Sequence, residues 1–194
     1  WDEEHGCILE WSDEPPEEET SGEAGDGERF DPGSITIGNS GAGLAPADLI
    51  RFERQCRIEL PLEYRQFLLS HNGGEPTPAH FVVSRDGFKQ HANIVRFFSL
   101  DGEDSLAGHR NLPNGEAWPA SLQPIARVRV ASLVRDLPDS LLVLRLSGKR
   151  AGEVLQIDPE IYAPETMGQP AEGNLPARIE ASLKYLPVVA WFFA

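Results

Sequence analysis

The most reactive side chains in this sequence belong to five histidines, two cysteines and a group of carboxylates near residue 103. No histidine lies four residues from another on an expected helix, which is the spacing that lets one helix face hold a metal ion. His80 and His91 could approach each other across a hairpin, but scattered surface histidines are the favoured interpretation. We therefore expect no metal site from the five histidines, which are His5, His71, His80, His91 and His109.

Acid–base chemistry is the one catalytic class that the loop carboxylates suggest. Asp101, Glu103 and Asp104 have the chemistry of general acids and bases, although acidic loop tips are far more often only solvated. The sequence has no Gly-rich phosphate-binding loop, no His-Glu-x-x-His and no Gly-x-Ser-x-Gly segment. We expect a protein that is not an enzyme, with no catalytic residues and no cofactor. The alternative is a pocket of another type, which would show as a deep cleft with several inward polar side chains.

The acidic charge of the chain is concentrated near its N-terminus. The sequence has 31 acidic and 17 basic residues, a formal net charge of −14. Thirteen of the acidic residues but only one basic residue, Arg29, lie between Asp2 and Asp31, which leaves 18 acidic and 16 basic residues elsewhere. This remainder is close to neutral and has no basic run or stripe. Because binding to nucleic acid needs such a surface, we expect none.

Hydropathy and cysteine usage bear on the compartment. No apolar run approaches the ~20 residues that a membrane-spanning helix needs, and no signal peptide is visible. Cys7 and Cys56 do not make a disulfide framework in a chain of this length, and a buried free thiol is the favoured interpretation. We expect a cytoplasmic protein that does not bind membranes.

The chain divides into an acidic extension, residues 1–43, and a folded domain, residues 44–194. The extension is rich in Pro, Gly, Ser and Thr, and such a composition buries too little apolar surface to offset the entropy of ordering. We expect it to be flexible. Two apolar islands, Cys7–Trp11 and Ile35–Ile37, are each either a short strand at a sheet edge or a loose segment.

Two helices are expected at the start of the folded domain. Pro46 opens the first, because proline suits the first helical turn, and apolar residues recur at helical spacing to Cys56. Pro61 opens the second, which runs to about His71. Asn72-Gly73-Gly74 ends it with residues that tolerate the left-handed conformation of a helix C-terminus.

After these helices the pattern changes to short extended runs, at 79–84, 93–99, 123–126, 141–146 and 153–157, with a helical turn expected around 105–107. Most runs are separated by tight, Gly- or Pro-containing connections, which indicates antiparallel pairing. A helix from about Pro176 follows, and Pro187 must kink or restart it. The expected fold class is α+β: an N-terminal helix pair packed on a mainly antiparallel sheet of about five to six strands, with a C-terminal helix.

The segment from Glu53 to Pro76 carries a specific motif. An acidic residue in a short helix is followed by Leu-Pro-x-x-Tyr-x-x-Phe-Leu and then by Asn-Gly-Gly-x-Pro. This string resembles the SUKH superfamily, the Smi/Knr cell-wall-regulator-like domains, over about residues 45–190. The residues on the family's positions are Glu53, Leu60, Pro61, Tyr64, Phe67, Leu68, Asn72, Gly73, Gly74 and Pro76.

The sequence departs from the family's pattern at two places. Glu63 stands where Asp is usual, on the expected outer face of its helix, and residues 127–139 lack an expected turn, which leaves the strand order there open. The motif itself has a physical basis, since Leu60-Pro61 sets a corner between two helices and the aromatic residues lock the second helix onto the sheet. We expect the motif residues to hold the fold rather than to contact a ligand.

The resemblance implies a protein that works by binding another protein. Bacterial members of the superfamily are commonly immunity proteins of polymorphic toxin systems, which neutralise a cognate toxin, often a nuclease, by direct contact. We therefore expect an immunity protein whose partner is a toxin domain. The alternative is a regulatory or adaptor protein that binds a cellular partner through the domain or through the acidic extension.

The long connection after residue 99 is the expected partner-binding surface. Trp118 has the character of an interface anchor, since it is a large aromatic residue flanked by polar ones, but core packing before Pro119 explains it equally well. The partner-binding residues expected there are Asp101, Glu103, Asp104, His109, Arg110 and Trp118.

Overall fold

The computed structural model describes residues 36–85, 88–102, 104–130, 139–163 and 174–183. In this part the chain forms a five-stranded antiparallel sheet in the order β3-β4-β5-β6-β7, and a separate antiparallel pair, β1-β2. The strands are β1 (Thr36–Gly38), β2 (Glu75–Thr77), β3 (His80–Arg85), β4 (Phe88–Phe97), β5 (Leu122–Val130), β6 (Ser140–Arg145) and β7 (Val154–Ile157). The helices are α1 (Pro46–Cys56), α2 (Leu62–His71), α3 (Pro159–Tyr162), α4 (Leu175–Ser182) and a 3-10 helix at Gly108–Arg110.

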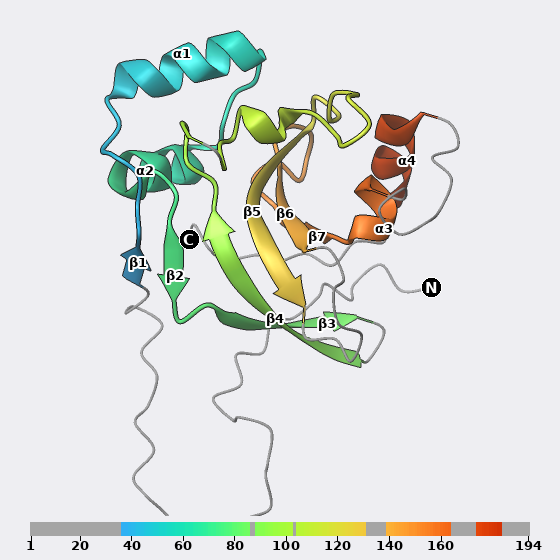
Figure 1. Ribbon diagram of the computed structural model, residues 1–194. Helices are drawn as coiled ribbons and strands as arrows, with labels where there is room; N and C mark the ends of the chain where they lie inside the picture. The colour runs from blue at the N-terminus through green and yellow to red at the C-terminus, as the bar shows by residue number, and fades with distance from the viewer. Residues whose placement is uncertain (1–35, 86–87, 103, 131–138, 164–173, 184–194) are drawn as a thin grey trace, which may run out of the picture.

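The helices lie at two places around the curled sheet (Figure 1). The α1–α2 pair lies near one end of β4, and α3 and α4 lie together beyond β7. The connection from β4 to β5, which contains the 3-10 helix, passes between these two groups. This arrangement places the long connection next to α3, where the pocket described below is found.

The core is centred on the last three strands of the sheet. All four residues of β7 are buried, as are the first five of β6. Strands covered on both faces read as continuous apolar runs rather than as an alternation, which explains the sequence Leu141-Leu142-Val143-Leu144. The first two helices complete the core with the buried side chains of Leu49, Phe52, Tyr64 and Leu68.

Glu53 fixes the corner between α1 and α2. Its Oε1 accepts a hydrogen bond from the backbone N–H of buried Leu60 at 2.8 Å, and its Oε2 lies 3.2 Å from the Arg65 guanidinium. Arg57, just after α1, adopts a left-handed conformation with φ 54°, and the next N–H, of Ile58, donates to the Glu53 carbonyl at 3.0 Å. One carboxylate therefore connects the first helix, the corner and the second helix.

Asn72 connects three segments at the end of α2. It is buried, with φ 48°, and its Oδ1 accepts from the Leu100 N–H at 2.8 Å while its Nδ2 donates to the Ala42 carbonyl at 2.7 Å. The next residue, Gly73, has φ +78°, and a Cβ there would lie 2.7 Å from Ser99 N and 2.8 Å from Phe97 O. The Asn-Gly sequence is thus required by side-chain hydrogen bonds at one position and by backbone crowding at the next.

The α+β fold class expected from the sequence is confirmed, with the helix pair, the antiparallel sheet and the C-terminal helix in place. Glu63 is exposed, as expected, and Cys56 is half-buried. The strand order left open by residues 127–139 is now clear, because β5 and β6 are antiparallel neighbours with Val128 opposite Ser140. The island Cys7–Trp11 and Pro187 lie outside the described residues, whereas Thr36 and Ile37 of the second island belong to β1.

The sequence pattern differs from the structure in several local details. It predicts neither β2, whose Glu-Pro-Thr has no apolar alternation, nor α3, which is a single turn. It starts the second strand of the large sheet at Asn93, whereas β4 begins at Phe88, because the polar residues Lys89–His91 hide a segment that pairs with β3 through its backbone. The helical turn expected around 105–107 is present, since the His109 N–H donates to the Ser105 carbonyl at 3.1 Å, and it continues into the 3-10 helix Gly108–Arg110.

Candidate functional site

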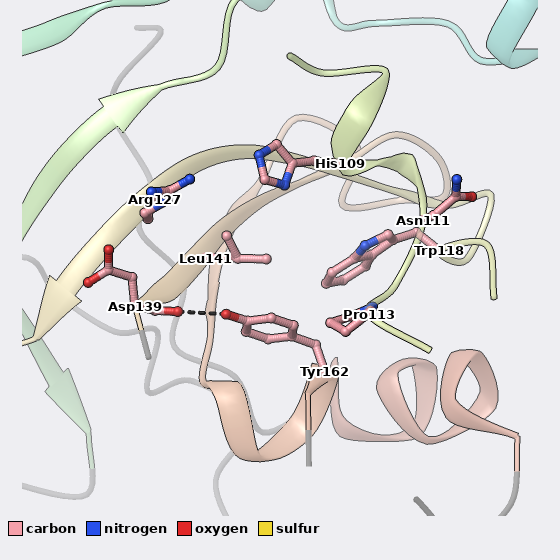
Figure 2. A pocket seen from close by; sticks show the side chains of 8 residues that line it. All are labelled: His109, Asn111, Pro113, Trp118, Arg127, Asp139, Leu141 and Tyr162. Carbon is pink, nitrogen blue, oxygen red and sulfur yellow. Dashed lines mark hydrogen bonds between the residues drawn. The ribbon is translucent and has the colours of Figure 1, made fainter. Parts of the chain in front are cut away.

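A pocket of about 360 Å³ opens between the β4–β5 connection, the start of β6 and α3 (Figure 2). Volumes of this order are typical of sites that receive a small molecule or a protruding side chain. Its upper rim in Figure 2 comes from the 3-10 helix, its floor from β5 and β6, and its lower wall from α3. The lining residues are His109, Asn111, Pro113, Trp118, Arg127, Asp139, Leu141 and Tyr162.

Asp104 organises the two basic groups at the rim of the pocket. Its Oδ1 lies 2.5 Å from Nη2 of Arg127, on β5, and 3.5 Å from Nε2 of His109, on the 3-10 helix. Both members of the Arg127 pair are about one third exposed, so this pair contributes modestly to stability. Its structural effect is to hold the guanidinium and the imidazole at one side of the opening.

His109 is also held in place by an aromatic stack. Its ring stacks on that of Phe98, with centroids 3.9 Å apart and an angle of 12° between the planes. Burial lowers the pKa of His109, and the Arg127 charge acts in the same direction, while the hydrogen bond and the negative charge of Asp104 oppose them. Burial is the largest of these causes, so the neutral imidazole is favoured in the folded protein.

Trp118 and Tyr162 form the aromatic wall of the pocket. Their ring centroids lie 6.1 Å apart, with 34° between the planes. The Tyr162 hydroxyl donates a hydrogen bond to the Asp139 carbonyl at 2.6 Å. Burial raises the pKa of Tyr162 to about 12, helped by the Asp139 and Asp158 charges and opposed by Arg127, so the hydroxyl keeps its proton at physiological pH.

Asp139 is the carboxylate among the residues that line the pocket. Its two oxygens accept from Nε and Nη2 of Arg129 at 3.2 and 3.4 Å, and only 17% of the side chain is exposed. In Figure 2 the carboxylate is turned away from Tyr162, while the backbone carbonyl is directed toward it. Asp139 therefore contributes structure to the pocket wall, and its charge is matched by Arg129.

The profile of the SMI1 / KNR4 family (SUKH-1) matches residues 43–154, more than half of the chain. The chain belongs to this family. The matched part contains the corner at Glu53, the Asn72 connection and the strands from β2 to the start of β7, whereas α3 with Tyr162 lies beyond it. Searches of curated proteins and of solved structures found no match.

Three of the partner-binding residues expected from the sequence of this SUKH domain gather at the pocket. His109 and Trp118 line it, and Asp104 holds its rim. Trp118 is only 4% exposed, so its ring is packed in the core on one side while an edge reaches the pocket. Its assignment as a partner-binding residue stays a prediction, as do those of His109 and Asp104.

The other three expected residues lie elsewhere. Asp101 is exposed in the turn after Leu100, and Arg110 turns inward, where its Nη1 donates to the Leu122 carbonyl at 2.6 Å. Glu103 lies outside the described residues. Arg110 thus orders the long connection against β5. Arg127 lines the pocket, whereas Arg110 does not.

Sequence reasoning does not find Arg127, Asp139 or Tyr162 as site residues. Arg127 is visible as one member of the alternation Arg127-Val128-Arg129-Val130, which indicates a strand with one polar face. Nothing local marks Asp139 and Tyr162, because they lie 23 residues apart and meet only when α3 folds back on the start of β6. Long-range pairing of this kind has no sequence period.

Neither a metal-binding cluster nor a membrane-spanning helix is found among the described residues. No group of three or more His, Cys, Asp or Glu side chains within the described ranges is arranged to hold a metal ion. His80 and His91 do meet across the β3–β4 hairpin, with Nε2 and Nδ1 3.2 Å apart, which shows that these two are not scattered. Among the helices that the structure describes, none combines the length and apolar character of a membrane span.

Proposed function

We propose that this SUKH-family protein is an immunity protein, which neutralises a cognate bacterial toxin by binding it directly and without catalysing a reaction. Family membership over residues 43–154 carries this proposal, because immunity proteins are part of the family. The pocket face is the surface that we assign to the toxin. It combines an aromatic wall with polar groups at a rim that solvent reaches.

The arrangement of groups supports binding rather than catalysis. His109 is directed at Asp104 and stacked on Phe98, and the residues that line the pocket include no serine, threonine or cysteine that it could activate as a nucleophile. Trp118 presents one edge of its packed ring to the pocket, where a side chain of the partner can contact it. The acidic residues before Asp31 add a negative potential that accelerates the approach of a basic partner.

The test is a growth-rescue and binding experiment with the full chain. Toxin domains encoded beside its gene are expressed alone and together with the chain, and complex formation is measured by calorimetry. Asn111→Arg places a long charged side chain at the exposed rim of the pocket. Gln55→Arg is the control, because it also replaces a neutral amide by arginine but lies on the outer face of α1. We expect one-to-one binding and rescue, with at least a tenfold loss of affinity for Asn111→Arg and none for Gln55→Arg.

Two results would contradict the proposal in different ways. If the chain binds no toxin encoded beside its gene and does not restore growth, and a cellular protein is captured instead, the immunity function is wrong and an adaptor function replaces it. If both variants restore the growth of toxin-expressing cells equally well, immunity stands but the pocket face is not the contact surface. The second outcome directs attention to the α1–α2 end of the sheet.

A further inference from the structure

Some hydrogen-bonding groups around the pocket already have partners, and others have none. Both carboxylate oxygens of Asp139 already accept from Arg129, and its carbonyl accepts from Tyr162. Arg127 presents five N–H donors, of which Nη2 is directed at Asp104. Within the described residues, its Nε and Nη1 make no hydrogen bond, and neither does the indole Nε1 of Trp118. The uncommitted groups at the pocket therefore include the donors of Arg127 and Trp118, beside the acceptor Nδ1 of neutral His109 and the amide of Asn111.

The Arg127 guanidinium is within reach of an occupant of the pocket. Arg127 is 37% exposed on its side chain, so a molecule entering the pocket reaches it without displacing Asp104. Asp104 engages Nη2 of the guanidinium, and the N–H groups of Nε and Nη1 remain to donate to a second carboxylate. A lysine side chain would meet the like charge of Arg127, and an acidic one the like charges of Asp104 and Asp139, so the free N–H donors of Arg127 are what favour a carboxylate.

The remaining walls suit the stem of such a side chain. Leu141 lies at the middle of the pocket in Figure 2, with the rings of Trp118 and Tyr162 beside it and Pro113 to the right, below Trp118. These groups offer apolar contacts to a short aliphatic stem, and the donors lie on the upper side near Arg127 and His109. A carboxylate on a short aliphatic stem satisfies both sides of the pocket.

We propose that the pocket receives a glutamate or aspartate side chain of the protein partner, which pairs with Arg127 and rests on Trp118 and Tyr162. The inference rests on the proposed function, since it names the group through which the partner is recognised at this face. The Asp104 carboxylate is then a positioning group, because it holds Arg127 through Nη2 while Nε and Nη1 are left for the incoming acid. Recognition of one acidic side chain is compatible with a partner that is basic as a whole.

The first test uses the wild-type full chain and small probes, so it does not depend on whether a variant folds. N-acetyl-glutamate N-methylamide and N-acetyl-lysine N-methylamide are titrated separately in ¹H–¹⁵N NMR. The Trp118 indole signal, identified by its loss in Trp118→Phe, and the Arg127 Nε–H signal are followed. We expect saturable shifts with the glutamate probe, at a Kd on the order of millimolar, and binding of the lysine probe at least roughly tenfold weaker.

A charge exchange with the captured partner provides the second test. Arg127→Glu should weaken the complex by tenfold or more, and Glu→Lys or Asp→Lys at one acidic position of the partner should restore it. Arg150→Glu is the matched control, because Arg150 is also ion-paired and partly exposed, at 54% of its side chain, but lies beyond the opposite end of β6. Arg127→Gln tests the loss of the positive charge without placing a second carboxylate beside Asp104.

The outcomes separate this inference from the proposed function. If the partner binds but neither probe shifts the Trp118 and Arg127 signals, or the lysine probe binds as well as the glutamate probe, the carboxylate assignment is wrong and immunity is unaffected. If no single Glu→Lys or Asp→Lys substitution in the partner restores its binding to the Arg127→Glu variant, the assignment is also wrong. If no toxin binds the wild-type chain, the proposed function fails, whatever the probes show.

Discussion

Replacing Asn72 tests whether the motif at the end of α2 acts through buried hydrogen bonds. The side chain satisfies the Leu100 N–H, which belongs to a residue only 6% exposed, and the carbonyl of exposed Ala42. In Asn72→Gly both bonds are lost, but the left-handed backbone at φ 48° is kept without strain. In Asn72→Ala the same bonds are lost and the left-handed conformation becomes unfavourable as well.

The size of each effect follows from these contacts. A buried N–H left without a partner costs about 1–3 kcal/mol, whereas water can replace Asn72 at the exposed Ala42 carbonyl. Alanine in the left-handed region adds about 1–2 kcal/mol. We therefore expect the free energy of unfolding to fall by about 2 kcal/mol in Asn72→Gly and by about 3–4 kcal/mol in Asn72→Ala. These are large fractions of a total stability of about 5–15 kcal/mol.

Urea unfolding at pH 7, followed by far-UV circular dichroism, measures both values. Asn39 provides the matched control, because it is also left-handed at φ 49° but is exposed, and its Nδ2 bonds only the Glu75 carboxylate at 2.8 Å. Asn39→Gly should change stability by less than about 0.5 kcal/mol. If Asn72→Gly is as harmless as Asn39→Gly, the buried hydrogen bonds do not stabilise the fold and the reasoning is refuted.

Two further predictions concern Glu53 and His109. Glu53→Ala leaves the buried Leu60 N–H without its acceptor and should lower the free energy of unfolding by about 2–3 kcal/mol. Glu53→Gln keeps an acceptor and should lower it by about 1 kcal/mol. Equal losses in the two variants would contradict this account of the corner. His109 has a lowered pKa in the folded state, so the unfolded chain binds its proton more tightly, and the stability contributed by neutral His109 is present above the unfolded pKa of about 6.5 and is lost as pH falls below it. Urea unfolding between pH 7.5 and 5.5 should therefore show a smaller loss of stability in His109→Phe, which preserves the stack on Phe98, than in the wild-type chain; identical pH profiles would rule out this role.

The motif that predicts the family also predicts where the chain turns, but not which atoms make it turn. Leu60-Pro61 and Asn72-Gly73-Gly74 indicate a corner and a helix end, because proline and glycine restrict or free the backbone locally. The hydrogen-bond partners of Asn72, Leu100 and Ala42, lie 28 and 30 positions away in the sequence. Such partners have no signal in local spacing.

The candidate site shows the same division. Asp104, His109 and Trp118 attract attention in the sequence by residue type, and they come together because a long connection folds over β5. Arg110, equally polar in the sequence, turns inward to a backbone carbonyl, since the buried Leu122 carbonyl needs a donor there. Type alone does not distinguish Arg110 from Arg127, and only the side of the strand or loop on which each lies does so.

The sequence by itself determines the helix pair, the antiparallel character of the sheet and the family, because proline corners, glycine turns and apolar periodicity act over a few residues. The tertiary structure alone decides that Arg127, Asp139 and Tyr162 form one pocket with the β4–β5 connection. These residues come from β5, the start of β6 and α3, and they meet because burial of both faces of β6 and β7 draws α3 and the long connection against the sheet. Burial depends on apolar area and is not directional, so it leaves no record in the spacing of the polar residues that it brings together.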